Sequence, residues 1–233
     1  MPALVNPFVY TPGIITALEA SLSPERFTTY VQAAGGHKEQ ALRLYVWNAA
    51  ISAAFYTPLQ GLEVTLRNAV HRALSRVYGV QWYDHPPLGL SPATLRQVSD
   101  AKDTLQKSRK PLDPPRIVAE LSWGFWVSLL GRGPRGRYET TLWRPALYRA
   151  FPHVRSLRKH VHAPLDYLRV FRNRIAHHEP IFARHLAADY ASIIKVITWI
   201  CPDTAAWIDH HNVVQATLAE RPPEGVPKVL ISC

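Results

Sequence analysis

Residues 58–79 read P-L-Q-G-L-E-V-T-L-R-N-A-V-H-R-A-L-S-R-V-Y-G, and the periodicity of this stretch decides the fold. A proline opens it and a glycine closes it, as is typical of the two ends of a helix. Its apolar residues recur at intervals of three and four, which places them on one face of a helix. That face is expected to be buried and to comprise Leu62, Leu66, Ala69, Ala73 and Val77.

The segments on both sides of this stretch follow the same helical pattern. Proline and glycine fall mostly between them, and no run alternates apolar and polar residues for long enough to indicate a sheet. We therefore predict an all-α fold with additional peripheral helices. Further helices are expected over residues 24–34, 38–56, 92–110, 117–130, 164 to about 179 and 183–200, with one or two short ones between 144 and 162.

Three of these helices carry more specific expectations. Ser23-Pro24 is typical of a helix cap followed by proline at the first helical position, and Gly35-Gly36 should end that helix. The helix over residues 117–130 is apolar nearly all round and is expected to lie in the core. The helix over residues 38–56 should bury Leu42, Tyr45, Val46, Ala49 and Ala53.

Length and composition indicate one globular domain. With 233 residues, 47% of them hydrophobic, the chain can fill a substantial core, which argues against disorder. No internal repeat and no linker separates independent parts, so we interpret residues 1–233 as a single helical domain. The last thirty residues, which are rich in proline, are expected to form a short helix and then, from about residue 212, an irregular tail.

Nothing in the sequence indicates secretion or membrane insertion. Cys201 and Cys233 lie far apart and lack metal-like spacing with the histidines, which fits a reduced cytoplasmic compartment. No Lys or Arg precedes a hydrophobic run near the start, and the most apolar stretch, residues 191–201, is short and interrupted by Lys195. We therefore expect a cytoplasmic protein with no membrane partner.

The net charge is strongly positive. Lysine and arginine number 27 against 17 acidic residues, for a formal charge of +10. Such a chain attracts polyanions such as RNA, although a solvated basic surface explains the charge equally well. The basic tract G-R-G-P-R-G-R at residues 131–137 has the same two interpretations, a flexible solvated connection or an RNA-phosphate contact. It is no P-loop, which would require Lys-Ser/Thr after the glycines.

Residues 171–182, F-R-N-R-I-A-H-H-E-P-I-F, concentrate acid-base and anion-binding groups at the end of one helix. Histidine exchanges protons near neutral pH, and arginine holds phosphate through two parallel hydrogen bonds. His177 and His178 should occupy the last helical turn before Pro180, where the helix dipole favours imidazolium, a ready general acid. Together these groups point to phosphodiester chemistry.

Arg172 should be partly desolvated, because it lies at the margin of an apolar helix stripe. An arginine in that position needs an anionic partner or a bound phosphate. Glu63 is the candidate partner. Arg67 and His71 follow it at four-residue steps, and Asn68 flanks this polar row. Two interpretations stay open: an internal ion pair that fixes helix packing, or a phosphate site.

Metal binding is the competing chemistry for the histidine cluster. Adjacent histidines project about 100° apart on a helix, whereas paired helical zinc ligands lie one turn apart. No cysteine or carboxylate spacing supports a metal site elsewhere. We therefore expect neither a metal nor another cofactor.

Several motifs, in order along the chain, resemble those of one family. They are S-P-E-R-F at 23–27, A-G-G at 34–36, L-E-V-T-L-R-N-A-V-H-R-A-L at 62–74, A-E-L-S-W-G-F-W at 119–126, A-F-P-H at 150–153 and R-N-R-I-A-H-H-E-P-I-F at 172–182. Through these motifs most of the chain resembles the Abi-like (abortive infection) proteins, a branch of the HEPN superfamily. The resemblance implies a HEPN-like helical bundle with an R-x-x-x-x-H ribonuclease signature.

Arg172 and His177 match that signature, and Asn173 is the polar residue that often follows its arginine. The resemblance implies metal-independent RNA cleavage, in which the 2′-hydroxyl attacks the adjacent phosphate. His177 would then transfer protons, Arg172 would stabilise the phosphorane charge, and Asn173 would orient the histidine or a phosphate oxygen. The supporting candidates are Arg174, His178 and Glu179.

The signature residues do not share a helix face, because residues five apart project about 140° from each other. HEPN domains commonly pair through their signature helices, which implies a homodimer whose groove both protomers complete. Alternatively, Arg174 and His178, one turn apart, form the working pair. The family signature favours Arg172 and His177.

Two functions stay open. The first is an endoribonuclease that is toxic to its own cell, serves in phage defence and is held silent by a protein or small RNA inhibitor. The second is a non-catalytic RNA-binding module that acts with a protein or RNA partner and whose histidines are structural. Catalysis would depend on His177, whereas binding would depend on arginine and on salt.

Overall fold

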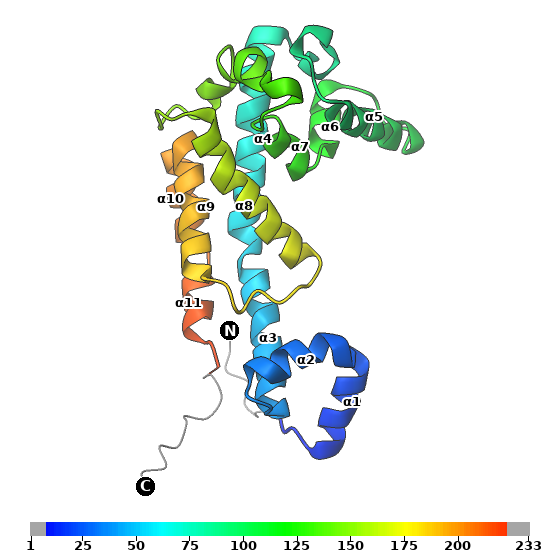
Figure 1. Cartoon of the computed structure of the whole chain (residues 1–233), viewed down its shortest axis with the longest axis vertical. Coiled ribbons are helices and arrows are strands. Elements are labelled where there is room, and N and C mark those ends of the chain that lie inside the picture. Colours follow the sequence, from blue (N-terminus) through cyan, green and yellow to red (C-terminus); the bar gives the residue numbers. More distant parts are fainter. Residues whose placement is uncertain (1–7, 223–233) are drawn as a thin grey trace. The chain divides into compact units, whose positions relative to one another are not determined.

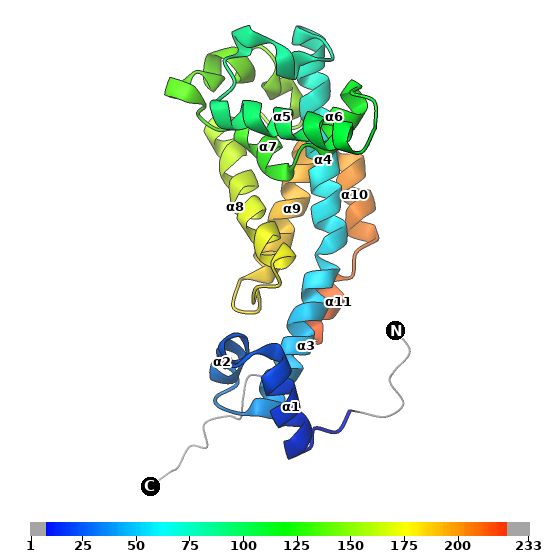
Figure 2. The ribbon, with the colours of Figure 1, turned by 90° about the vertical axis from the view of Figure 1, so that its right-hand side faces the viewer.

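The computed structural model describes residues 8–222, and these residues are all-α (Figures 1 and 2). No β-strand occurs among them, so the predicted fold class is confirmed. They form two compact units, one of residues 8–54, 180–184 and 213–222, the other of residues 55–179 and 185–212. The single domain over residues 1–233 stays a prediction. Within the described part, no helix combines the length and apolar character needed to cross a membrane.

The first unit contains α1 (Pro12–Leu22), α2 (Pro24–Ala33), α3 (Lys38–Ala54) and α11 (Val214–Ala219). The predicted start of α2 is confirmed, since the hydroxyl of Ser23 accepts a hydrogen bond from the backbone N–H of Arg26 at 3.4 Å. The predicted end of α2 is confirmed too, because Gly35 and Gly36 follow it with φ of 62° and 91°. Only glycine adopts such angles without strain.

Two helices of this unit differ from the sequence prediction. α1 was not expected; the hydroxyl of Thr11 caps it by accepting from the N–H of Ile14 at 3.3 Å. α11 lies in the stretch that was expected to be irregular from about residue 212. The indole N–H of Trp47 donates to the carbonyl of Thr217 in α11 at 2.8 Å and so ties it to α3. The remainder of the predicted tail, residues 223–233, lies outside the described residues.

The buried face of α3 is rotated from the predicted one. Of the five predicted residues, Leu42 is buried, Tyr45 is half-buried, and Val46, Ala49 and Ala53 are exposed. The buried face instead includes Trp47, Asn48 and Ile51. Asn48 explains the difference, because its side-chain oxygen accepts hydrogen bonds from the backbone N–H groups of Ile181 at 2.8 Å and Phe182 at 3.1 Å. The hydrogen bonds of the buried Asn48 thus determine which face of α3 is buried, and apolar periodicity did not predict that face.

The second unit contains α4 (Tyr56–Tyr78), α5 (Pro92–Lys107), α6 (Pro114–Glu120), α7 (Trp123–Ser128), α8 (Arg158–Ala176), α9 (Leu186–Ile200) and α10 (Pro202–His210). α9 packs against α4 and α10, and α8 packs against α7 and α9 (Figures 1 and 2). The predicted buried face of α4 is confirmed at Leu62, Leu66, Ala69 and Ala73. Val77, in the last turn of α4, is 43% exposed, so the prediction is wrong for this residue.

The predicted core helix over residues 117–130 is two shorter helices, α6 and α7. Ser122 separates them, because its hydroxyl accepts a hydrogen bond from the N–H of Phe125 at 3.3 Å and so caps α7. The core position is confirmed, since Phe125 and Trp126 are fully buried with ring centroids 5.0 Å apart. The ring of Trp82 lies 6.1 Å from both and completes an aromatic cluster.

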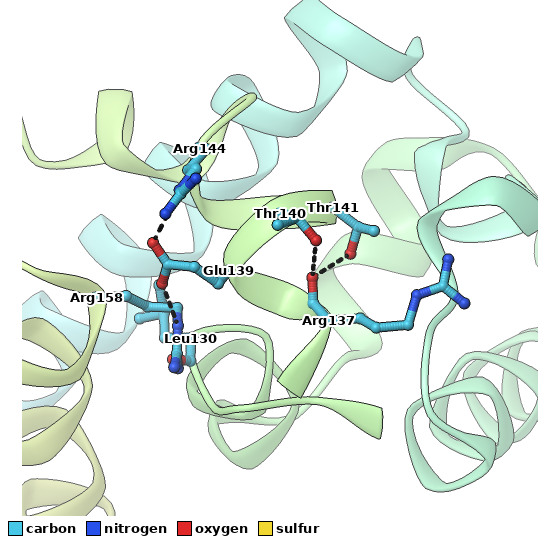
Figure 3. A network of polar contacts seen from close by, with 7 residues as sticks. All are labelled: Leu130, Arg137, Glu139, Thr140, Thr141, Arg144 and Arg158. Atoms are coloured by element: carbon cyan, nitrogen blue, oxygen red, sulfur yellow. Dashed lines mark hydrogen bonds and ion pairs between the residues drawn. The ribbon is translucent and has the colours of Figure 1, made fainter. Parts of the chain in front are cut away.

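Short helices connect the rest of this unit: η1 (Trp82–Asp84), η2 (Pro86–Leu88), η3 (Pro134–Gly136), η4 (Glu139–Trp143) and η5 (Leu147–Ala150). The basic tract at residues 131–137 contains η3 and leads into a polar network (Figure 3). Glu139 bridges Arg144 at 3.4 Å and Arg158 at 3.0 Å. The guanidinium of Arg137 extends away from this network (Figure 3). An RNA contact by this tract stays a prediction.

Candidate active site

α8 carries the candidate catalytic residues and begins earlier than predicted. It starts at Arg158 and includes Pro164 in its interior, rather than beginning at Pro164. The guanidinium of Arg158 donates to the carboxylate of Glu139 at 3.0 Å and to the carbonyl of Leu130 at 2.6 Å (Figure 3). The side chain of Val161 is fully buried one turn later. These contacts offset the helix hydrogen bond that proline removes.

α8 ends at Ala176, three residues before the predicted end. The N–H of Glu179 donates to the carbonyl of Arg174 at 2.8 Å, and with a second bond from the N–H of His178 it forms a Schellman motif. This motif requires a left-handed residue, and His178 adopts φ of 56°. His178 therefore lies beyond the last helical turn, and the prediction that it occupies that turn is wrong. His177 is at the boundary, because its N–H still donates to the carbonyl of Asn173 at 2.9 Å.

Both histidines present their side chains to solvent. His177 is the C-cap residue of α8, and the imidazoles of His177 and His178 are exposed. Beside them, Nε of Arg174 lies 3.2 Å from a carboxylate oxygen of Glu179. A phosphate would compete with this carboxylate for the guanidinium of Arg174.

A cavity of about 350 Å³ lies between α4 and the last turns of α8, and we call it the Arg172 cleft. It is lined by Tyr56, Leu59, Gln60, Glu63, Val64, Arg172, Ile175 and Ala176. Nη2 of Arg172 lies 3.8 Å from Oε2 of Glu63, which confirms the expected pairing of these two residues. The apolar stripe predicted on α8 comprises Leu165, Leu168, Phe171 and Ile175, and it is confirmed except at Ile175, which is half-buried and lines the cleft. Its buried members are Leu165, Leu168 and Phe171.

The ion pair between Arg172 and Glu63 is long and open to solvent. The Arg172 side chain is 42% exposed and the Glu63 side chain is 26% exposed. Such a pair stabilises a protein by about 0.2–1 kcal/mol, because water screens both charges. A guanidinium has five N–H donors, and the contact with Glu63 engages one of its terminal nitrogens. Arg172 therefore keeps most of its hydrogen-bonding capacity for a ligand in the cleft.

His71 was expected in the same polar row but has a structural role. Its Nδ1 accepts a hydrogen bond from the indole N–H of Trp82 at 3.0 Å. An indole N–H only donates, so this ring nitrogen carries no proton and the imidazole is neutral. Burial, followed by the positive charge of Arg72, lowers the pKa of His71 below its ordinary value of 6.5. Its neutral form thus fixes Trp82 against α4.

Only one residue of the predicted polar row on α4 reaches the cleft. Glu63 lines it, whereas Arg67, Asn68 and His71 do not. Helix geometry explains this, because each four-residue step turns the side chain by about 40°, so His71 is rotated by about 80° from Glu63. Asn173 is half-buried on α8 and does not line the cleft either.

Two residues of the cleft with polar side-chain groups were missed by the sequence prediction. Tyr56 and Gln60 line the cleft but were not among the candidates. They precede Glu63 by seven and three residues, and those intervals place all three on one helix face. Counting backwards from Glu63 at helical spacing would have found both.

No family model matches the chain, and no curated protein or solved structure matches it either. Within residues 8–222, no three His, Cys, Asp or Glu side chains are placed to hold a metal ion. The functional conclusion therefore depends on the chemistry and geometry of the residues themselves.

Proposed function

We propose that the protein is a metal-independent endoribonuclease of the HEPN type that acts in abortive infection or toxin-like phage defence. The observation that carries the proposal is the half-exposed guanidinium of Arg172 in an open cleft, with its Glu63 contact at 3.8 Å. A phosphate oxygen accepts stronger, shorter hydrogen bonds from a guanidinium than this contact provides. Such an activity would harm its own cell, so a protein or small RNA inhibitor belongs to the proposal.

The proposed chemistry requires two proton transfers. One group removes the proton of the RNA 2′-hydroxyl, which then attacks the phosphorus, and another protonates the 5′-oxygen that leaves. We assign these transfers to His177, whose imidazole is exposed at the end of α8. Arg172 stabilises the charge that develops on the phosphorane, and Asn173 orients the histidine or a phosphate oxygen.

A second copy of the chain would supply the second imidazole. Within one copy, His177 does not line the cleft that holds Arg172. Two copies that pair through the ends of α8 about a two-fold axis would bring two guanidinium and two imidazole groups to one groove. A homodimer is therefore part of the proposal.

Cleavage of a single-stranded or looped RNA in EDTA tests this proposal. The wild-type protein should leave 2′,3′-cyclic phosphate ends without added metal, and His177→Ala should slow cleavage by about 100-fold or more. His160→Ala is the matched control, because His160 is also an exposed histidine of α8, and it should cleave like the wild type. Unchanged cleavage by His177→Ala would remove His177 from the mechanism.

A non-catalytic RNA-binding module is the second candidate, and the position of His177 outside the cleft favours it. Such a module would leave RNA intact in the wild type and in His177→Ala. Arg172→Ala would still weaken binding, and would lower the slope of log affinity against log salt by about 0.7 for single-stranded RNA. Fluorescence anisotropy with a labelled oligonucleotide measures both quantities.

A further inference from the structure

A second cavity, of about 160 Å³, lies between α4, η5 and the end of α9. We call it the arginine pocket. Its lining includes three arginines, Arg72, Arg76 and Arg149, and three alanines, Ala69, Ala73 and Ala150. The alanines are buried and form small apolar walls, whereas the arginines are exposed. Among the described residues, 8–222, no acidic residue lines the pocket.

The three arginines of this pocket have no carboxylate partner within residues 8–222. Other arginines of the chain do, and several pair with an acidic residue three or four positions away. These pairs are Arg43–Glu39, Arg116–Asp113 and Arg169–Asp166. Arg72, Arg76 and Arg149 differ from these paired arginines, and they line the same pocket.

The positive charges that line the pocket repel one another, and this repulsion is unfavourable when no anion is bound. Arg72 and Arg76 lie one turn apart on α4, where two like charges destabilise a helix. Arg149 brings a third guanidinium from η5. It is oriented locally, since it donates to the carbonyl of Pro145 and its Cζ lies 4.8 Å from the centre of the Tyr148 ring. A bound anion would relieve the repulsion among the three cations.

The size and walls of the pocket define the kind of anion. At about 30 Å³ per water molecule, the cavity has room for about five waters, or for one tetrahedral oxyanion and its first waters. No aromatic side chain lines it, so it offers no surface on which a base would stack. Several guanidinium groups around one small cavity match the oxygens of a phosphate dianion.

We propose that the arginine pocket binds the phosphomonoester group of a small phosphorylated ligand. The site is separate from the Arg172 cleft. Glu63 and Arg72 are nine residues apart on α4, which corresponds to opposite faces of the helix and about 13 Å along its axis. The pocket therefore goes beyond the proposed ribonuclease function, and its ligand binds whether or not the protein cleaves RNA.

Isothermal titration calorimetry with inorganic phosphate tests the pocket directly. The wild-type protein should bind phosphate with a dissociation constant of about 1 mM or below, and Arg76→Gln should bind about 10-fold more weakly. Arg96→Gln is the matched control, because Arg96 is an exposed arginine of α5 without an ion pair, and it should bind like the wild type. Should Arg76→Gln fail to fold, Arg72→Gln carries the same expectation. Absence of phosphate binding, or equal weakening by Arg96→Gln, would overturn the proposal.

Three further compounds identify the source of the phosphate. Adenosine 5′-monophosphate should bind at least as well as inorganic phosphate and should lose affinity in Arg76→Gln, whereas adenosine should not bind. An oligodeoxynucleotide without terminal phosphates lacks the 2′-hydroxyl and cannot be cleaved, and its affinity should be the same for Arg76→Gln and Arg96→Gln. A selective loss of oligodeoxynucleotide binding in Arg76→Gln would overturn the proposal in favour of a nucleic-acid backbone site. None of these measurements depends on cleavage.

Discussion

Residues of α4 line both the Arg172 cleft and the arginine pocket, and the two cavities differ in the carboxylate of Glu63, which lines the cleft. In the cleft, Glu63 of α4 lies 3.8 Å from the guanidinium of Arg172. In the pocket, Arg72 and Arg76 of α4 lie beside Arg149, and no acidic residue from the described part of the chain lines the cavity. One helix thus supplies the negative charge to the first cavity and the positive charge to the second.

This difference determines how the positive charge of each cavity is balanced when no ligand is bound. The guanidinium of Arg172 lies beside the carboxylate of Glu63, whose negative charge weakens the attraction of the cleft for a phosphate. The three arginines of the pocket can be neutralised only from outside. A carboxylate added to the pocket or removed from the cleft should therefore change anion binding in opposite directions.

The largest effect is expected when a carboxylate is placed in the arginine pocket. Arg76→Glu would remove one cation and put a carboxylate one turn from Arg72, as an internal partner. Phosphate affinity should fall by about 100-fold or more, since a charge-assisted contact is lost and a repulsive one is added. Calorimetry with inorganic phosphate measures the loss.

The control for this exchange is cleavage by the same variant. Arg76→Glu should cleave RNA at the wild-type rate, because Arg76 is more than three helical turns from Glu63. A parallel loss of phosphate binding and cleavage would mean that the two cavities are one functional site.

A smaller effect is expected when the carboxylate is removed from the cleft. Glu63→Gln should raise the affinity for an uncleavable oligodeoxynucleotide by about 2- to 5-fold, which corresponds to the energy of an exposed ion pair. Glu120→Gln makes the same change of net charge at an exposed residue without an ion pair, so it is the matched control. Equal gains in both variants would show that net charge, and not the contact with Arg172, governs binding.

The buried face of α4 could be predicted from the sequence, whereas the buried face of α3 and several helix ends could not. The face of α4 follows from Leu62, Leu66 and Ala69, whose apolar side chains recur at helical spacing. The break at Ser122 and the end of α8 at Ala176 depend on hydrogen bonds to capping groups, which compete with continued helix. A periodic pattern does not show whether the helix continues at such a position or ends there in a capped turn.

The Arg172 cleft could be predicted in part from the sequence, whereas the arginine pocket could not. Glu63 and Arg172 lie at the margins of apolar helix stripes, so their pairing followed from helix geometry. Arg149 comes from η5, a short helix between residues 144 and 162, where no periodic pattern fixes the direction of a side chain. Its approach to Arg72 and Arg76 is a product of tertiary packing between η5 and α4.

Replacement of the strained residue at the end of α8 separates the two possible catalytic pairs. His178 has φ of 56°, which glycine adopts without strain, so His178→Gly should stabilise the protein by about 0.5–1 kcal/mol. His177→Gly should not, because His177 has φ of −93°. Thermal unfolding measures both changes. Cleavage should survive in His178→Gly, and its loss there would favour Arg174 and His178 as the working pair.

The smallest effect concerns pH and His71 of α4, which holds Trp82 through a hydrogen bond. Burial first, and Arg72 second, lower the pKa of His71 below 6.5, so the unfolded chain binds a proton more readily than the folded one. The contribution of His71 to the free energy of unfolding is therefore fully present above pH 6.5. It is lost as the pH falls through the pKa of His71 in the folded protein. The unfolding midpoint should drop between pH 7.5 and 5.5, and less so in His71→Gln, whose amide oxygen can still accept from Trp82. His160→Gln, at an exposed position, should follow the wild type, and an unchanged pH dependence in His71→Gln would show that other groups cause the drop.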